Sequence, residues 1–321
     1  MAQGVAYLTH PDCARHDLGP WHPESPKRLA AVDQALREAA WFDRLLAVEA
    51  PAATLEQILR THTQAHVDSL RDAIPRSGVN WLDPDTGLNP FSWEAALRAA
   101  GAAVRAVDTV MQGDVSRAFC NVRPPGHHAG SNRPMGFCLI NNVAVGVMHA
   151  LAEYRLRRIA IVDFDVHHGN GTEDIFRSEP RVLLCSSFRH PFYPHSGANS
   201  AHPGFIPAPL PEGADGGQFR EAVEQKFLPA LEAFRPELIF ISAGFDAHRD
   251  DPLGGLRLVE DDYAWITHEI CVIADRHASG RVVSALEGGY DLAALGRSAV
   301  AHVKALNSVM HCQNGQCIND D

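Results

Sequence analysis

Short apolar runs alternate with longer segments rich in alanine and leucine along most of the chain. The short runs are apolar at successive positions, which is typical of parallel strands buried on both faces. They predict strands at Arg117–Asn121, Ile159–Phe164, Val182–Ser186, Leu238–Ala243 and Arg281–Leu286. The longer segments predict helices at Glu94–Met111, Asn142–Tyr154 and Phe219–Phe234. This alternation predicts an α/β fold with a central, mostly parallel sheet and helices on both faces.

No internal repeat or flexible linker divides the 321 residues. We therefore expect one domain over residues 1–306, followed by a disordered tail over 307–321. The tail contains Cys312 and Cys317, which could pair or bind a metal, although a disordered end is the favoured reading. The other five of the seven cysteines are scattered, as in a reduced cytoplasmic protein.

Charge and composition exclude several classes of protein. The formal net charge of −11 argues against a nucleic-acid-binding protein, which needs a basic surface. The first residues lack the basic start and apolar run of a signal peptide, and no stretch approaches the roughly 18 apolar residues of a membrane span. We expect a cytoplasmic protein without nucleic-acid or membrane partners, and homo-oligomer formation stays open. Histidine is abundant, with 18 residues against 28 lysines and arginines together.

Four predicted strands are each followed by histidine, aspartate or tyrosine beside glycine. The segments are VRPPGHHAG (122–130), DVHHGNGT (165–172), FDAHRDDP (245–252) and EGGY (287–290). The carboxyl ends of parallel strands meet at one edge of a sheet, where ligands of open α/β sheets bind. We therefore expect these four segments to form one site.

Two of these segments predict a metal centre. Asp165 and His167 are two positions apart, so their side chains point the same way in extended backbone, and Asp246 is the candidate third ligand. An Asp/His/Asp set leaves coordination positions open, which is typical of catalytic metal sites. The alternative, in which Asp165 only caps the following helix, loses weight once Asp246 is considered. Gly169 and His248 stand where a second ion would need carboxylates, so we predict one ion.

The adjacent histidines His127 and His128 predict proton transfer beside this metal. A metal lowers the pKa of a bound water toward ~7, where an imidazole can accept the proton. Asp163 and Asn170 flank the metal ligands and could orient the two histidines separately. Tyr290 could donate a hydrogen bond to an oxyanion, although a half-buried core tyrosine explains it equally well when it is taken alone.

Six motifs, in this order, resemble those of the zinc-dependent histone deacetylases and their bacterial amidohydrolase relatives. They are HPESPKRL (22–29), RPPGHHA (123–129), GFCLINN (136–142), DFDVHHGNGT (163–172), SAGFDAHRDDPLGG (242–255) and EGGY (287–290). They cover roughly residues 5–305, and Asn170 resembles the class II branch. The resemblance implies the single-domain arginase/deacetylase fold.

The resemblance also implies roles for individual residues. It implies one zinc ion per chain held by Asp165, His167 and Asp246, and proton transfer by His127 and His128. Asp163 and Asn170 would stand behind these histidines, and Tyr290 would polarise the acyl carbonyl. A structural potassium is implied at Asp163, Asp165, His167, Ser186 and Ser187. A second potassium is implied at backbone carbonyls near Phe176 and Val182.

The resemblance implies a narrow substrate tunnel lined by Gly136 and Phe137, with Gly288 close to the substrate. Two residues depart from the family pattern. Tyr193 replaces a wall phenylalanine, which adds a hydroxyl to an apolar slot and leaves the preferred acyl chain open. Leu253 stands where acetylpolyamine-selective relatives carry a rim glutamate, which favours acyl-lysine as the substrate.

The predicted reaction is hydrolysis of an N6-acyl-lysine amide by a metal-activated water, with the histidine pair moving the proton and Tyr290 stabilising the oxyanion. Leu253 disfavours the alternative of an acetylpolyamine or other small-molecule amidohydrolase. Gly169 disfavours a binuclear ureohydrolase, and the complete residue set disfavours a non-catalytic acyl-lysine binder. His168 is expected to be a packed, structural histidine. The physiological substrate and the choice between zinc and iron stay open.

Overall fold

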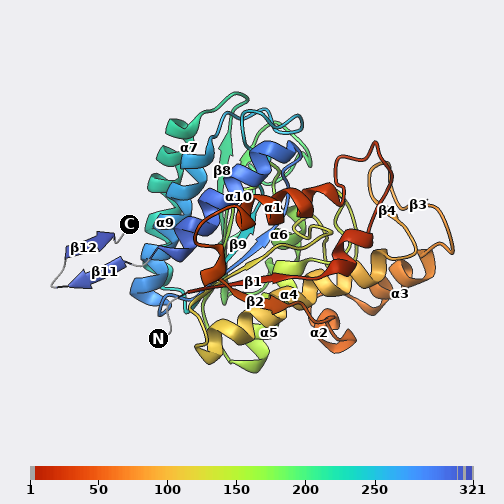
Figure 1. Ribbon diagram of the computed structural model, residues 1–321, viewed down its shortest axis with the longest axis horizontal. Coiled ribbons are helices and arrows are strands. Elements are labelled where there is room, and N and C mark those ends of the chain that lie inside the picture. Colours follow the sequence, from red (N-terminus) through yellow and green to blue (C-terminus); the bar gives the residue numbers. More distant parts are fainter. Residues whose placement is uncertain (1–3, 309, 314–315, 320–321) are drawn as a thin grey trace.

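An eight-stranded sheet forms the middle layer of the computed structural model, which describes residues 4–308, 310–313 and 316–319 (Figure 1). The strand order is β2-β1-β5-β10-β9-β6-β7-β8, and every pairing within it is parallel. The strands are β1 (Val5–Thr9), β2 (Leu46–Glu49), β5 (Arg117–Cys120), β6 (Ile159–Asp163), β7 (Val182–Arg189), β8 (Phe205–Leu210), β9 (Leu238–Ala243) and β10 (Val282–Leu286).

Helices cover both faces of this sheet, as predicted. The α-helices are α1 (Lys27–Arg37), α2 (Leu55–Leu59), α3 (Gln64–Ala73), α4 (Ser92–Gln112), α5 (Asn142–Glu153), α6 (Asn170–Phe176), α7 (Gly216–Ala222), α8 (Leu228–Phe234), α9 (Glu260–His277) and α10 (Leu292–Asn307). Helices α4 and α5 pack together on one face, while α1, α9 and α10 pack together on the other (Figure 1). Among the described helices, none is both long and apolar enough to cross a membrane.

The sequence predicted the five central strands and missed β1, β2 and β8. Strand β2 is largely exposed at one edge of the sheet, so it lacks the continuous apolar pattern of a buried strand. Strand β8 contains Pro207 and Pro209 and lies at the other edge, where a strand tolerates missing N–H donors. Two of the three missed strands, β2 and β8, therefore lie at the edges, whereas β1 is buried inside the sheet and was missed although its residues are apolar.

The helix predicted over Phe219–Phe234 is interrupted in the structure. Helix α7 ends at Ala222, a π-helical turn spans Val223–Phe227, and α8 follows. Pro229 has no N–H to donate within a continuous helix, which explains why a wider turn comes just before it.

Two short antiparallel pairs stand apart from the main sheet. Strands β3 (Asn80–Trp81) and β4 (Gly87–Leu88) form one of them. The backbone of β11 (Met310–Gln313) and β12 (Gln316–Asn319) forms the other, with Cys312 opposite Cys317. The cysteine side chains lie outside the described part of the chain. The domain limit at residue 306 and a tail that is disordered in solution stay predictions.

Buried neutral histidines predict how stability depends on pH. Burial lowers the pKa of both His62 and His302 from 6.5 to about 3. As the pH falls below 6.5, these histidines bind protons in the unfolded chain, whereas in the folded chain they stay neutral until about pH 3. The free energy of unfolding therefore decreases. Each histidine contributes at most about 1.4 kcal/mol per pH unit.

Guanidinium unfolding at pH 7.5, 6.5 and 5.5 measures this dependence. We expect stability to fall between pH 6.5 and 5.5, and we expect His302→Gln to be less stable but less sensitive to pH. Equal stability at all three pH values would contradict the assignment of these histidines as buried and neutral.

Candidate metal centre and pocket

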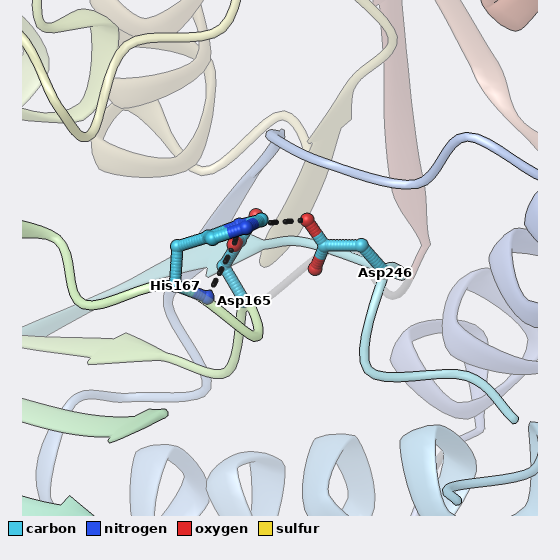
Figure 2. Close-up of side chains that lie close together, drawn as sticks. All are labelled: Asp165, His167 and Asp246. Atoms are coloured by element: carbon cyan, nitrogen blue, oxygen red, sulfur yellow. Dashed lines mark hydrogen bonds and ion pairs between the residues drawn. The ribbon is translucent and has the colours of Figure 1, made fainter. Parts of the chain in front are cut away.

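Adjacent parallel strands place the three predicted metal ligands together. Strands β6 and β9 are neighbours, with Asp163 opposite Ser242 at their carboxyl ends. The chain continues from β6 into Asp165 and His167, and from β9 into Asp246. Figure 2 shows the three side chains converging from these two strand ends. One ligand atom from each lies within 4.8 Å of the others.

Specific hydrogen bonds orient the two carboxylates. The backbone N–H of Val166 donates to Asp246 Oδ1 at 2.9 Å, and that of Gly288 donates to Asp165 Oδ2 at 2.9 Å. His167 Nδ1 lies 3.0 Å from Asp165 Oδ1 and 3.2 Å from Asp246 Oδ2. Asp246 Oδ2 is buried and receives no hydrogen bond of regular geometry within the described chain. A buried, under-satisfied carboxylate oxygen beside a second carboxylate calls for a cation.

The donor set and the surrounding space fit a zinc ion. One imidazole nitrogen and two carboxylates are ligands that zinc uses in catalytic sites. A Cβ at Gly288 would lie 2.0 Å from Asp246 Oδ2 and 2.6 Å from Asp165 Oδ2, so only glycine leaves this cradle clear. The pKa shifts of these groups point to the same need for positive charge. Burial and the Asp165 carboxylate raise the pKa of Asp246 to about 7. Burial opposes protonation of His167, but its hydrogen bond to Asp165 and its close contact with the Asp246 carboxylate outweigh burial and raise its pKa to about 10.

Gly169 bears on the number of metal ions. A Cβ at this position would lie 2.3 Å from Asp163 Oδ2. No ligand side chain therefore fits at residue 169 without displacing Asp163, and a single ion stays a prediction.

The histidine pair lies beside this centre with the orienting partners that the sequence predicted. His127 Nδ1 lies 3.0 Å from Asp163 Oδ2, and His128 Nδ1 lies 2.7 Å from Asn170 Oδ1. The two imidazole rings are 4.0 Å apart between centroids, and both are buried. The His128 ring lies 5.8 Å from that of His167.

The environments of the two histidines separate their pKa values. Burial opposes protonation of His127, but the charges of Asp165 and Asp163 outweigh it and raise its pKa well above 6.5. Burial and the neighbouring His127 and His167 lower the pKa of His128 well below 6.5. This difference in pKa favours a charged His127 beside a neutral His128.

The centre opens into a pocket of about 160 Å³. The lining residues are Asp85, His128, Gly136, Phe137, His167, Phe192, Tyr193, Leu253 and Tyr290. The structure thus brings the predicted tunnel residues Gly136, Phe137, Tyr193 and Leu253 together with Tyr290. Gly288 lies against the carboxylates of Asp165 and Asp246, outside this lining.

Several residues around the pocket were missed by the sequence reasoning. Asp85 and Phe192 line it. The position of Phe192 next to Tyr193 could have indicated Phe192, but no signal in the sequence indicated Asp85. Glu287, in the EGGY motif, is fully buried, and its Oε2 accepts hydrogen bonds from the backbone N–H of Gly126 at 2.7 Å and of His127 at 3.1 Å. Burial raises the pKa of Glu287 to about 7. Glu287 therefore braces the loop that carries the histidine pair.

The structure brings some of the predicted potassium ligands close together. Ser186 pairs with Asp163 across β6 and β7, and its Oγ is buried without a hydrogen bond in the described chain. Ser187 is also buried. Phe176 and Val182 lie at the two ends of the turn from α6 to β7. Potassium binding at either place stays a prediction.

The fold and this strand-end site define the class of protein. It is an α/β protein with the arginase/deacetylase fold and a buried Asp/His/Asp cluster open to one pocket. A family model described as histone deacetylase domain matches residues 22–306, and the chain belongs to that family.

Similar proteins agree with this assignment. An uncharacterised Synechocystis protein is 39% identical over 308 residues, which cover 94% of this chain and 99% of that protein. The histone deacetylase-like amidohydrolase of Pseudomonas aeruginosa is 36% identical over 295 residues, which cover 90% of this chain and 77% of that enzyme. The crystal structure of the HDA15 HD domain matches with a TM-score of 0.88 at 34% identity, covering 95% of this chain and 90% of that one. The predicted family is therefore confirmed, and a hydrolase activity is supported.

Chelation tests the metal centre through stability. Removing a bound cation leaves the carboxylates of Asp165 and Asp246 facing each other in a buried site, so we expect the melting temperature to fall. One equivalent of Zn²⁺ should restore it by about 5 °C or more, as for a ligand far above its Kd. Differential scanning calorimetry measures this shift. Asp246→Asn is the matched control, and an equal zinc response in this variant would contradict the assigned ligand set.

Proposed function

We propose that the chain is a zinc-dependent amide hydrolase that removes acyl groups from N6-acyl-lysine. The observation that carries this proposal is that the cluster of Asp165, His167 and Asp246 meets a pocket through His167. The same pocket is lined by His128 and Tyr290. The relative from Pseudomonas aeruginosa that is named a histone deacetylase-like amidohydrolase supports the same reaction class.

A zinc ion held by Asp165, His167 and Asp246 would polarise the amide carbonyl and acidify a water molecule. His128 is placed to receive the proton. Its Nδ1 faces Asn170 Oδ1 at 2.7 Å, which makes Nδ1 the N–H donor and leaves Nε2 as the acceptor. His128 lines the pocket, whereas His127 lies behind it against Asp163. His128 therefore accepts the proton and returns it to the leaving lysine amine. The charged His127 lowers the pKa of His128.

Tyr290 is placed to stabilise negative charge on the substrate. Burial raises the pKa of its phenol well above 10, so the hydroxyl stays protonated at neutral pH. A protonated phenol in the pocket wall donates a hydrogen bond to the oxyanion that develops as the amide is attacked. The backbone N–H of Tyr290 donates to Asp251 Oδ2 at 2.6 Å, which fixes the residue's position.

The shape of the pocket favours a slender acylated side chain. Phe137 packs edge to face against Tyr290, with 5.8 Å between ring centroids, and Tyr193 stands near His128, at 5.3 Å. Leu253 contributes an apolar side chain at the position where the resemblance implies a rim glutamate in acetylpolyamine-selective relatives, and Asp85 is the one carboxylate among the described residues that line the pocket. We therefore favour acyl-lysine in a peptide or protein, with acetyl as the first acyl group to test. The proposal includes the two potassium sites, a cytoplasmic location, and no nucleic-acid or membrane partner.

Two single substitutions test the assigned roles. His128→Ala removes the proton acceptor and Tyr290→Phe removes only the phenol hydroxyl, so each should lower kcat on an acetyl-lysine peptide by about 100-fold or more. Zinc content and circular dichroism should match those of the wild type, since neither residue is a metal ligand. Turnover close to wild type in either variant would remove that residue from the proposed role.

The same assay separates the substrate classes. The wild-type enzyme should hydrolyse acetyl-lysine peptides with a higher kcat/KM than N-acetylated polyamines. The reverse order would favour the acetylpolyamine alternative, while both substrates would still use the same metal centre.

A further inference from the structure

One long loop supplies a wall of the pocket. Residues 190–204 join β7 to β8 without a helix or strand of their own, and they carry Phe192 and Tyr193. The Phe192 ring stacks on His167 with 5.4 Å between centroids, and the Tyr193 ring stands 5.9 Å from that of His167. The position of this loop therefore determines the width of the pocket beside the metal ligand.

Two side chains of the loop connect its middle to the rest of the protein. Ser196 Oγ lies 2.9 Å from His168 Nδ1, and Ser200 Oγ donates to Glu173 Oε1 at 2.5 Å. Backbone bonds from His195 to Phe192 and from Ser200 to Gly197 shape the loop internally. Within the described chain, no other hydrogen bond joins residues 191–200 to the rest of the fold.

The partners of these serines form a buried pair. His168 Nε2 lies 3.0 Å from Glu173 Oε2, and the exposed fractions of the two residues are 1% and 6%. The His168 ring lies between Phe188 and Phe205, at 4.9 and 5.3 Å between centroids. His168 is thus the packed histidine that the sequence predicted, and it also holds a loop.

Glu173 keeps its charge in this position. Burial alone would raise its pKa, but the close contact with His168 and the hydrogen bond from Ser200 outweigh burial and lower it. A charged carboxylate is a stronger hydrogen-bond acceptor than a neutral one, so Glu173 is a firm attachment point for Ser200.

We infer that His168 and Glu173 are positioning residues that hold the β7–β8 loop and thereby set the acyl-chain selectivity of the pocket. His167 belongs to the metal centre, while its neighbour His168 anchors the loop that forms the opposing wall of the pocket. Helix α6 contributes Glu173 to this anchor and Asn170 to the orientation of His128. One short helix therefore positions both the pocket wall and the proton acceptor. The inference rests on the proposed function for its acyl-chain readout.

The loop side of the anchor gives the cleaner test, because substitution of His168 could disturb the adjacent ligand His167. Ser196→Ala/Ser200→Ala removes both hydroxyl groups from a partly exposed loop. Asn199→Ala is the matched control, because its side chain lies in the same loop and makes no hydrogen bond within the described chain. The substrates are peptides that contain acetyl-, butyryl- or hexanoyl-lysine.

The double variant should lose preference between acyl chains. We expect its ratio of kcat/KM for acetyl over hexanoyl to change by about fivefold or more, mainly through KM, while kcat on the best substrate stays within about twofold. Hydrogen exchange in residues 190–204 should also become faster, with the melting temperature unchanged. Asn199→Ala should behave as the wild type in each measurement.

Specific results would overturn the inference. Unchanged exchange in the double variant would show that the two serines do not hold the loop. Faster exchange with unchanged acyl selectivity, or an equal change in Asn199→Ala, would remove the anchor from control of selectivity. A wild-type protein inactive on every acyl-lysine peptide would refute the proposed function instead, and the exchange measurement would still test the anchor.

Discussion

Two buried carboxylates that face one point are the constraint around which this site is built. Parallel pairing of β6 with β9 brings Asp165 and Asp246 off neighbouring strand ends into the interior, where charge is costly. The hydrogen bonds that these carboxylates accept do not compensate their negative charge. The raised pKa values of Asp246 and His167 show that this site favours added positive charge. A bound cation with open coordination positions would supply that positive charge and, in the proposed function, the reactivity at the same place.

The surrounding residues follow from this concentration of negative charge. Asp163, two residues before Asp165, holds His127 at 3.0 Å, and the charges of Asp165 and Asp163 favour the charged form of His127. Burial, together with the neighbouring His127, keeps His128 neutral, and Asn170 orients His128 without adding charge. The two histidines differ in charge because carboxylates outweigh burial at His127, whereas burial prevails at His128. In the proposed reaction, this difference would give the two adjacent histidines separate roles in proton transfer.

Much of the fold and of the reactive residues could be predicted from sequence, for identifiable reasons. Strands such as Ile159–Asp163 are apolar at successive positions because both faces are buried, and the residues after them must meet at one edge. Edge strand β8 escaped notice because Pro207 and Pro209 contradict a strand pattern. Residues that brace the site, such as Glu287, act through backbone amides of distant segments, and such contacts leave no periodic signal in the sequence.

The function of His168 shows the same limit. Its burial was predictable from the motif, but its contact with Ser196 depends on the path of an irregular loop. Loop paths follow from tertiary contacts, and neither hydrophobic periodicity nor the spacing of the motif specifies them. The wall that Tyr193 forms is consequently a property of the folded chain, although the tyrosine itself was visible as a departure from the family.

The most direct test of a single-ion hydrolytic centre is anomalous diffraction at the zinc absorption edge from crystals of the zinc-loaded protein. The predicted result is one anomalous peak about 2.0–2.2 Å from the imidazole nitrogen of His167 and from carboxylate oxygens of Asp165 and Asp246. A second peak within about 4 Å of the first would indicate a binuclear centre. A peak bound to other residues, with none at this cluster, would contradict the assignment of the site.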